Sequence, residues 1–411
     1  MTHMPKPLYL AAGAYTMSLG TGRPEFNPRK ARPGLEHYIQ EVGRAVFDQI
    51  EDPDVIDEGV IGNFMAARFN KQGHLGSLMT IAHPSLEYKP MIRVEGACAS
   101  GGLALATGIK SVLSGLADSV LVMGVEVQNT VKAVYGADIL AGAGWFAGER
   151  KAGGTYFFPQ KFSDRAGAFG QKYGVEKSRA AMAHWYATAI ENARLNPLAQ
   201  EHHNAVKDLV GLGLTPPDAR TFCEHINLFH CSKVSDGAAA IVVCTKEGYK
   251  RLGLKRKDVV KIVGYGHAAA NLTAPPPELT ELTTSRKASG LARKMAKISA
   301  EDYGVIEVHD CFSITGMLSL EALELAGPGQ SIDLVMAGEN KRTGRFPTNT
   351  GGGLVGYGHP TGASGVRMAV DLWKQLTGKA GDFQIQLQKE HGVMISMGGN
   401  DKTVVSLVLK R

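Results

Sequence analysis

The sequence carries GHPTGASG at residues 358–365 and a shorter stretch of the same kind, GACASG, at residues 96–101. Each is a polar turn that opens a helix of small residues. Each helix leads to a predicted strand, which ends at Gly124 in the first copy and at Gly398-Gly399 in the second. A duplicated α/β unit produces this kind of repetition. We therefore expect two related halves, with the two turns at comparable ends of two sheets.

Short apolar runs alternate with amphipathic stretches on either side of these turns. Such alternation favours layered α/β packing around a largely buried sheet. The predicted strands cover residues 8–15, 120–125, 238–244, 259–264, 303–308, 391–397 and 403–409. The predicted helices cover residues 101–116, 178–194, 313–325 and 363–376.

One part of the chain departs from this alternation. Residues 129–231 are rich in glycine, alanine and aromatic residues, with few strand-like runs, which is typical of a large insertion. A second boundary is expected near NLTAPPPE at residues 271–278, which interrupts any regular element. We therefore predict an N-terminal core half at residues 1–128, an inserted loop domain at 129–231, the rest of the N-terminal half at 232–272, and a C-terminal half at 273–411.

Composition excludes several classes of protein. The 411 residues include 50 glycines without a three-residue period, which excludes collagen, and 5 cysteines, an odd and small number for a disulfide scaffold. Reduced thiols in an intracellular compartment are expected instead. No apolar run approaches the roughly 18–20 residues that span a bilayer, so we expect a soluble chain.

Charge and the termini add weaker indications. The formal net charge is +6 without a basic stripe, so nucleic acid is not an expected partner, and an anionic small ligand is favoured. No signal-peptide core stands near the N-terminus, and the sequence ends in Leu409-Lys410-Arg411 rather than in the peroxisomal signal S-K-L. We expect a location in the cytoplasm or the mitochondrion.

Cys98 is a candidate nucleophile. It stands among small residues just before a predicted helix, where the positive end of the helix dipole favours a thiolate. Gly96, Gly101 and Gly102 leave room for a substrate and for backbone N–H groups. A small buried core cysteine is the alternative, because most free cysteines are of that kind.

His359 is a candidate base. Flanking glycines and Pro360 hold it on a turn, and such a turn presents the imidazole to a cavity, where it can take a proton from a thiol. A histidine that only caps the following helix is the alternative.

The third group is HDCF at residues 309–312, which directly follows the predicted strand at 303–308. Open α/β sheets collect catalytic groups where a strand ends and a helix begins. His309 can donate a hydrogen bond to a developing oxyanion, and Cys311 can carry a proton. Asp310 would as readily cap the following helix.

A competing cluster contains Cys223, His225, His230 and Cys231. Two sulfur and two nitrogen ligands so close in sequence suit tetrahedral zinc. Their spacing, however, lacks the paired C-x₂-C and H-x₃-H pattern of zinc sites. We therefore expect no metal.

Together these motifs resemble those of the thiolase superfamily. The motifs are CASG at 98–101, SDGAAA at 235–240, HDCF at 309–312 and GHP at 358–360, and their order and spacing match over essentially the whole chain. The resemblance is strongest to thiolases of the sterol-carrier-protein type and their thiolase-like relatives, which carry HDCF where ordinary thiolases have NEAF. It implies an α/β thiolase fold of duplicated αβαβα core halves with an inserted loop domain.

The resemblance also implies an activity and a role for each residue. The substrates would be coenzyme A and acyl-CoA thioesters, with no cofactor required. Cys98 would accept the acyl group, His359 would activate it, and His309 would stabilise the enolate oxyanion. The N–H groups of Cys98 and of a glycine near Gly398 would form a second oxyanion hole. The expected function is that of a 3-ketoacyl-CoA thiolase or acetoacetyl-CoA-forming acyltransferase, with ping-pong kinetics through S-acyl-Cys98.

One feature departs from the family pattern. Ordinary thiolases carry a second reactive cysteine in a C-x-G motif near the C-terminus, whereas the matching stretch here is ISMGGN at residues 395–400. Cys311 is the last cysteine in the chain, and the HDCF thiolases use the cysteine of that motif as general acid and base. We therefore expect Cys311 to transfer the proton at the substrate α-carbon.

Two kinds of alternative function stay open from the sequence. One is another enzyme of the same fold, such as a ketoacyl synthase, a hydroxymethylglutaryl-CoA synthase or a retro-aldolase. The presence of Cys98 argues against the aldolase, and HDCF together with GHP argues against the synthases. The other is a CoA-binding thiolase-like protein with weak or no thiolase activity, which the missing C-terminal cysteine favours.

Contacts to the phosphates of coenzyme A are expected in the inserted domain. Lys151, Lys161 and Arg165 are the candidates there, against the alternative that they belong to the solvated surface. Members of the family are commonly dimers, so a homodimer is the expected assembly.

Overall fold

Nine strands form one mixed sheet in the part of the chain that the structure, a computed structural model, describes: residues 4–150 and 155–411. Their order across the sheet is β3-β2-β4-β5-β1-β6-β9-β8-β7. The strands are β1 (Leu8–Tyr15), β2 (Glu58–Gly62), β3 (Met91–Val94), β4 (Ser119–Glu126), β5 (Gly237–Cys244), β6 (Val260–Ala269), β7 (Tyr303–Val308), β8 (His391–Gly398) and β9 (Thr403–Lys410).

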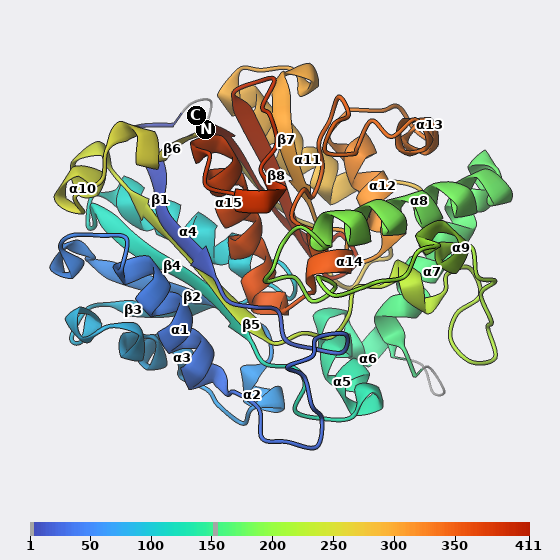
Figure 1. Ribbon diagram of the computed structural model, residues 1–411, viewed down its shortest axis with the longest axis horizontal. Helices are drawn as coiled ribbons and strands as arrows, with labels where there is room; N and C mark the ends of the chain where they lie inside the picture. The colour runs from blue at the N-terminus through green and yellow to red at the C-terminus, as the bar shows by residue number, and fades with distance from the viewer. Residues whose placement is uncertain (1–3, 151–154) are drawn as a thin grey trace.

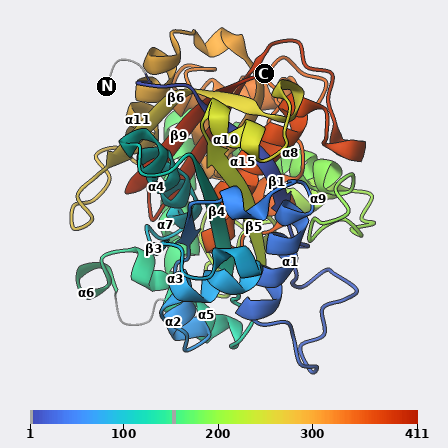
Figure 2. The ribbon, with the colours of Figure 1, turned by 90° about the vertical axis from the view of Figure 1, so that its left-hand side faces the viewer.

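The strands lie in two layers, with helices between and outside them (Figure 1). α4 (Ser100–Ser114) and α15 (Thr361–Thr377) contact strands of both layers, so they form the middle of the molecule. α1 (Leu35–Phe47) packs beside β4 and β5 on the outer side of one layer (Figure 2). α11 (Thr283–Ala296) packs on β6 and β9 of the other. The expected αβαβα arrangement is confirmed.

The two strand layers are joined into one sheet, although the sequence suggested two sheets. β1 pairs with β6 at Leu8–Ile262, Tyr9–Lys261 and Leu10–Val260. This short antiparallel contact connects an N-terminal layer of five strands to a C-terminal layer of four. It also satisfies backbone groups that would otherwise form an open edge inside the protein.

Glycines allow the two central helices to approach each other closely. A Cβ atom on Gly101 of α4 would lie only 2.8 Å from the carbonyl oxygen of Gly362. A Cβ atom on Gly365 of α15 would lie 2.4 Å from the backbone nitrogen of Gly102. Any larger residue would push the helices apart. The small residues therefore bring the N-terminal ends of α4 and α15 together, and with them the two turns that precede these helices.

The segment between β4 and β5 contributes helices and connecting loops, and no strand of the sheet, in its described residues (Figure 1). The ring of Phe162 in this segment stacks on Phe312 of the HDCF motif, with centroids 4.5 Å apart. The segment is thus packed against the strand ends of the C-terminal half. The limits of a separate inserted domain at residues 129 and 231 stay predictions. The helices between β4 and β5 are α5 (Ala133–Leu140), α6 (Phe146–Glu149), α7 (Phe157–Tyr173), α8 (Val175–Ala193) and α9 (Leu209–Gly213).

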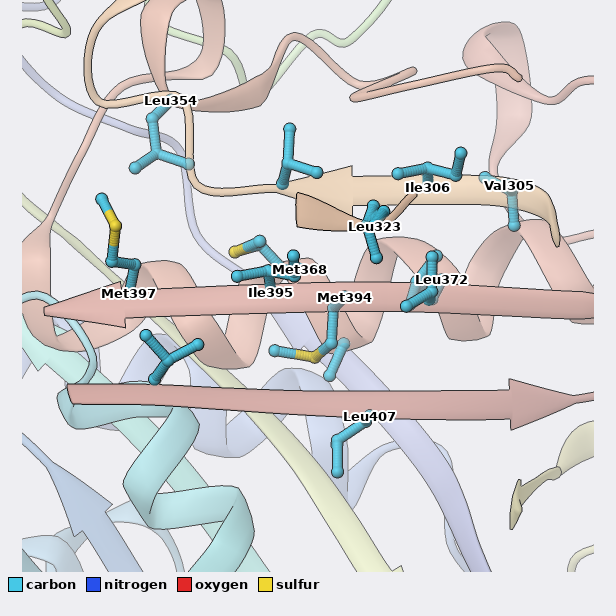
Figure 3. Packing of buried hydrophobic residues seen from close by; sticks show 14 of the residues in the cluster. Val305, Ile306, Leu323, Leu354, Met368, Leu372, Met394, Ile395, Met397 and Leu407 are labelled. Atoms are coloured by element: carbon cyan, nitrogen blue, oxygen red, sulfur yellow. The ribbon is translucent and has the colours of Figure 1, made fainter. Parts of the chain in front are cut away.

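Apolar packing fixes the strand ends of the C-terminal half. Figure 3 shows Ile306 of β7 and Ile395 of β8 beside Met368 and Leu372 of α15, and all four side chains are fully buried. Burial of each such side chain typically contributes about 1.5–3 kcal/mol. The ends of β7 and β8, where the HDCF and Gly398-Gly399 segments begin, are therefore held by a rigid core.

Most predicted elements agree with the structure to within a few residues. The strand at 303–308 coincides with β7, and the helix at 363–376 lies within α15. β2 and β3 were missed, because β2 is short with two glycines and β3 is only partly buried. α1, α7 and α11 were not predicted either. The remaining helices are α2 (Ala66–Phe69), α3 (Leu75–Leu78), α10 (Lys246–Arg251), α12 (Ser313–Ala322), α13 (Ser331–Met336) and α14 (Gly353–Tyr357).

One helical stretch meets the length and composition of a membrane span, contrary to the expectation that no apolar run approaches that length. It is Ala97–Ser114, with a mean hydropathy of 1.2 over 18 residues, and 61% of it is buried inside the protein. It is central helix α4 with the residues just before it. Its apolar character is explained by packing between the two strand layers.

Candidate active site

The structure brings together the side chains of Cys98, His309 and His359. The cysteine sulfur and one ring nitrogen from each histidine all lie within 4.8 Å of one another. The two imidazole rings meet edge to face, with centroids 5.0 Å apart and planes at 84°. Cys98 precedes α4, His359 precedes α15, and His309 follows β7. The close packing of the two central helices therefore builds this cluster.

Ser364 fixes the tautomer of His359. The Nδ1 atom of His359 lies 2.7 Å from the Ser364 Oγ atom, and that hydroxyl donates its single hydrogen to the carbonyl of Pro360 over 3.0 Å. With the hydroxyl hydrogen directed to Pro360, the assigned tautomer of His359 carries its hydrogen on Nδ1 and donates it to Ser364. This leaves Nε2 with a free lone pair, and Nε2 is buried without a hydrogen-bond partner among the described residues. His359 is thus arranged to accept a proton through Nε2.

The backbone of His359 is held by the other half of the protein. Its N–H donates to the Oγ atom of Ser235 over 2.9 Å, and its carbonyl accepts from the side-chain amide of Gln128 over 2.8 Å. Ser235 belongs to the SDGAAA motif, and Gln128 follows β4. Asp236 accepts from the backbone N–H of Gln128 over 2.6 Å. The SDGAAA motif therefore positions the histidine and does not itself reach the cavity.

Asp310 connects the HDCF motif to the turn that carries His359. Its carboxylate accepts from the backbone N–H of Leu354 over 2.6 Å and from the Trp185 indole over 3.0 Å. Leu354 is in α14, which leads to His359. The alternative that Asp310 caps α12 is wrong, because the carboxylate is used by these two donors. Burial raises the pKa of Asp310 to about 6, while its hydrogen bonds oppose that rise.

The protonation state of Cys98 differs from the expectation based on the helix dipole. Burial, followed by the nearby Glu126 carboxyl, raises the pKa of the Cys98 thiol to about 12. A hydrogen bond from the backbone N–H of Gly399 acts in the opposite direction. The helix-end effect is typically below about 1 kcal/mol at an exposed site, which desolvation easily exceeds. Cys98 therefore rests as a thiol and needs a base.

The backbone N–H of Gly399, the residue next to Gly398, forms a hydrogen bond with the Cys98 sulfur. A Cβ atom on Gly398 would lie 2.2 Å from the carbonyl of Gly96, so Gly398 is needed for close packing of two turns. Gly399 has a positive φ of 65° and lines the cavity beside Cys98. A role of these N–H groups as an oxyanion hole stays a prediction.

Both histidines are held neutral. Burial, followed by the positive charge of Arg367, lowers the pKa of His359 to about 3. Burial and the neighbouring His359 lower the pKa of His309 well below its ordinary value. Arg367 is fully buried, forms an ion pair with Asp371, and lies 3.5 Å from the carboxyl of Glu307. Neutral imidazoles can accept a proton or donate a hydrogen bond, as the expected roles require.

Cys311 lines the same cavity as Cys98. Its Sγ atom is 3.8 Å from the Thr315 hydroxyl, and burial raises the pKa of the thiol well above its ordinary value. The protonated thiol is the resting form. Cys311 is therefore placed to give a proton to a carbanion and to recover it in the reverse direction.

The cavity at these residues has a volume of about 190 Å³ and a largely apolar wall. A second, polar hollow of about 390 Å³ adjoins it and shares Tyr156 and Phe157 with it. The second hollow carries the basic side chains of Arg150, Lys161 and Arg220. The apolar cavity at Cys98 is lined by Phe64, Cys98, Gln128, Ala133, Ala137, Leu140, Ala143, Tyr156, Phe157, Phe158, Pro159, Phe162, Cys231, Ser232, Lys233, Val234, Cys311, Phe312, His359, Thr361 and Gly399.

The three basic residues predicted to contact coenzyme A have different positions. Lys161 lines the polar hollow, with its Nζ atom 2.8 Å from Glu149. Arg165 is completely buried and donates to the carbonyls of Leu279 and Glu281, so its candidacy as a phosphate contact is wrong. Lys151 lies outside the described residues.

The alternative zinc cluster is not assembled. The His230 Nδ1 atom is 3.3 Å from the hydroxyl of Ser313, and the ring of His225 packs against Gly167 of α7. Within residues 4–150 and 155–411, Cys98, His309 and His359 form the one histidine, cysteine and carboxylate group close enough to share a metal ion. In the described residues, no three of these four side chains bring their ligand atoms close enough to share a metal ion.

Sequence reasoning missed Glu126 and Ser364. The carboxyl of Glu126 accepts from the N–H groups of Phe64 over 2.8 Å and of Gly362 over 3.1 Å, so it connects loops of both halves. An acid at the end of an apolar strand was the available signal. Ser396 stands in the stretch that lacks the cysteine, and its Oγ atom points between Gly102 and Gly365, where it cannot replace a thiol in the cavity.

Comparisons with known proteins agree with this architecture. The family model for the thiolase C-terminal domain-like region matches residues 264–411. The acetyl-CoA acetyltransferase of Methanocaldococcus jannaschii is 33% identical over 95% of this chain and 97% of its own. Human sterol carrier protein 2 is 28% identical over 72% of this chain and 54% of its own. Human mitochondrial 3-ketoacyl-CoA thiolase in complex with CoA shares the fold, with a TM-score of 0.71 at 16% identity, covering 99% and 98% of the two chains. The chain belongs to the thiolase superfamily.

Proposed function

We propose that this acyltransferase forms or cleaves 3-ketoacyl-CoA, with Cys98 as the carrier of the acyl group in a ping-pong cycle. The proposal is carried by one observation: the Cys98 sulfur lies within 4.8 Å of a ring nitrogen of His359. Because Nδ1 is occupied by Ser364, the available nitrogen is Nε2. A thiol beside a neutral, oriented imidazole is the arrangement of an activated nucleophile.

In the first half-reaction, the thiol proton of Cys98 passes to Nε2 of His359. The thiolate attacks the thioester carbonyl of acyl-CoA, and the carbonyl oxygen becomes negative. N–H groups such as that of Gly399 stabilise this charge. The carbon–sulfur bond to coenzyme A then breaks, and the departing thiolate takes the proton from His359. The products are S-acyl-Cys98 and free coenzyme A.

In the second half-reaction, a carbon–carbon bond forms. The Cys311 thiol first releases its proton to solvent, and the resulting thiolate takes a proton from the α-carbon of a second acyl-CoA, while His309 stabilises the enolate oxygen. The enolate carbon attacks the acyl carbonyl on Cys98, and the departing Cys98 thiolate takes up a proton from solvent, which restores both thiols. Cleavage runs through the same steps in reverse, with the Cys311 thiol as the proton donor. The raised pKa of this thiol suits the donor role in cleavage.

The two adjoining hollows support a CoA thioester as the substrate. The apolar cavity reaches Cys98, and the polar hollow beside it carries Arg150, Lys161 and Arg220. This order suits a long ligand with a thioester at one end and phosphates at the other. The name of the archaeal relative, acetyl-CoA acetyltransferase, supports acetyl-CoA as one substrate.

The decisive experiment detects the covalent intermediate. The protein is mixed with acetyl-CoA alone, quenched in acid, digested and analysed by mass spectrometry. We expect an acetyl group on the Cys98 peptide, none on the Cys223 and Cys244 peptides of the same digest, and no product in Cys98→Ala. An unmodified Cys98, or acetyl transfer by Cys98→Ala at the wild-type rate, would refute the proposal in favour of a CoA-binding protein or another enzyme of this fold.

We further propose a homodimer. β3 has a single neighbour, β2, within the described part of the sheet, and Ile92 on β3 is 41% exposed. An edge strand of this kind offers unpaired backbone groups to a second chain. Light scattering during size-exclusion chromatography should give twice the chain mass, and Ile92→Lys should lower it. A wild-type monomer at micromolar concentration would contradict this assembly.

A further inference from the structure

We propose that Cys98, His309 and His359 form a zinc-binding site, and that zinc bound there blocks the nucleophile. The metal would act as an inhibitor and not as a cofactor. The inference concerns regulation of the proposed active site, and its second part rests on the proposed function of Cys98. The metal site itself rests on geometry and donor chemistry.

The spacing of the three ligand atoms is close to what zinc needs. A point equidistant from three atoms that are 4.8 Å apart lies about 2.8 Å from each of them, and 4.8 Å is the upper limit of their separation here. Zinc bonds measure about 2.3 Å to sulfur and about 2.0–2.1 Å to imidazole nitrogen. Each side chain therefore needs to move by less than about 1 Å, which small rotations of the side-chain torsions supply.

The histidines have unused ring nitrogens. The Nε2 atom of His359 and the Nδ1 atom of His309 are both buried and lack a hydrogen-bond partner among the residues that the structure describes. Such buried polar atoms ordinarily have a partner. Ser364 already holds Nδ1 of His359, as the second-shell groups of metal-binding histidines do. The ring is thus oriented to present Nε2 to a metal.

The donor set selects the metal. One sulfur and two imidazole nitrogens suit zinc, whereas calcium and magnesium prefer oxygen ligands. Three protein ligands leave a fourth tetrahedral position open, and Cys98 and His359 both line a cavity that can supply a water molecule there. The triad therefore matches a site with three protein ligands and one exchangeable ligand.

Zinc binding to these three side chains changes no oxidation state, and every bond and proton is accounted for. The S–H bond of Cys98 breaks, a sulfur–zinc bond forms, and the proton leaves to solvent. Each imidazole gives a lone pair to the metal. The sulfur and Nε2 that zinc uses are the nucleophile and the base of acyl transfer, so one site cannot hold zinc and accept an acyl group at the same time.

The test uses the full-length, tag-free protein and zinc alone. After equilibrium dialysis against Zn²⁺ and removal of loosely bound metal, we expect one zinc per wild-type chain and none in Cys98→Ala or His359→Ala. His225→Ala is the matched control, because His225 belongs to the unassembled cluster, and it should retain one zinc. Co²⁺ in place of Zn²⁺ should give the wild type a thiolate-to-cobalt charge-transfer band that Cys98→Ala lacks.

Wild-type protein that binds no zinc, or Cys98→Ala that keeps the full amount, would overturn the inference. Circular dichroism confirms that each variant is folded, and the cobalt band on wild-type protein is independent of any variant. The two proposals fail separately. Acetylation of Cys98 without zinc binding contradicts this inference alone, whereas zinc binding without acetylation contradicts the proposed function alone. If the proposed function and the zinc site are both correct, Zn²⁺ should suppress acetylation of Cys98 in competition with acetyl-CoA.

Discussion

The Nδ1 atom of His359 lies 2.7 Å from the hydroxyl oxygen of Ser364, which is in the first turn of α15. With the hydrogen of that hydroxyl directed to the carbonyl of Pro360, the hydroxyl oxygen accepts from the imidazole. The helix therefore determines which nitrogen of His359 is free. The same helix packs closely on α4, next to Cys98. One helix end thus sets the position of the base, its tautomer and its distance from the nucleophile.

Ser364→Ala should slow acylation of Cys98 without preventing it. The variant removes the acceptor of the Nδ1 hydrogen, so the ring can rotate or adopt the other tautomer. Because general base catalysis typically contributes about 10²–10⁴-fold, partial loss of the base should lower the acylation rate about 10- to 100-fold. Rapid quench with acetyl-CoA, followed by mass spectrometry of the Cys98 peptide, measures this rate.

Ser319→Ala is the matched control for that variant. Ser319 is also buried in a helix, and its hydroxyl donates to the carbonyl of Thr315 four residues earlier over 2.7 Å, as Ser364 does to Pro360. No hydrogen bond joins Ser319 to His359 among the described residues. Ser319→Ala should acylate at the wild-type rate. Equal rates in both alanine variants and the wild type would contradict the role of Ser364.

Cys311→Ala should separate the two half-reactions. Cys98 and its base are unchanged in this variant, so acylation by acetyl-CoA should proceed. Formation of acetoacetyl-CoA needs the α-proton transfer and should fall by about 10²–10⁴-fold. Cys223→Ala, which removes a buried thiol outside the cavity, should retain both reactions. Loss of acylation in Cys311→Ala would show that Cys311 does not act only on the α-carbon.

Much of the site could be predicted from the sequence because each residue has a local signal. Cys98 and His359 stand on glycine-rich turns before helices, and the HDCF residues follow an apolar strand directly. These placements depend on neighbours in the sequence. The assembly of the three segments also follows from a duplicated fold, in which equivalent helix ends meet.

The features that the sequence did not predict depend on contacts between residues that are distant in sequence. Arg165 contacts carbonyls more than 110 residues away, so nothing near it in the sequence marks it as buried. The raised pKa of Cys98 comes from burial and from Glu126, neither of which the helix-dipole argument includes. The joining of two strand layers depends on three residue pairs between β1 and β6. Local patterns cannot specify any of these.

Arg165→Met should destabilise the protein and should not weaken binding of the CoA phosphates specifically. The guanidinium donates to the carbonyls of Leu279 and Glu281 and to the side chain of Asn400, and methionine leaves these buried acceptors without a donor. We expect a loss of about 3 kcal/mol in the free energy of unfolding, because unsatisfied buried groups are costly. Urea unfolding followed by circular dichroism measures it.

Lys161→Met is the control for that prediction, since it removes a cation of the same inserted segment. Lys161 is 28% exposed and pairs with Glu149, so its loss should change stability by less than about 1 kcal/mol. Its position in the polar hollow should instead raise the KM for acetyl-CoA. A stable Arg165→Met protein with a raised KM would restore Arg165 as a phosphate contact.

Asp236 should make stability depend on pH. It is buried, and its Oδ1 atom accepts from the N–H groups of Gln128 and Asn129 over 2.6 and 2.9 Å, while Oδ2 has no partner among the described residues. Burial raises the pKa of Asp236 to about 6 in the folded protein, from an ordinary value of 3.8, despite these donors. The folded state therefore keeps a proton that the unfolded state releases.

The contribution of protonated Asp236 to the free energy of unfolding is fully present below about pH 4 and is lost as pH rises through about 6. Its size is about 3 kcal/mol, from roughly 1.36 kcal/mol for each unit between the two pKa values. Asp236→Asn retains an oxygen for Gln128 and Asn129 but cannot titrate. Urea unfolding of both proteins at pH 4 and pH 7 cancels the effect of other buried acids, such as Asp310 and Glu126. The wild type should lose more stability than the variant between these values, and equal losses would show that Asp236 is already ionised at pH 4.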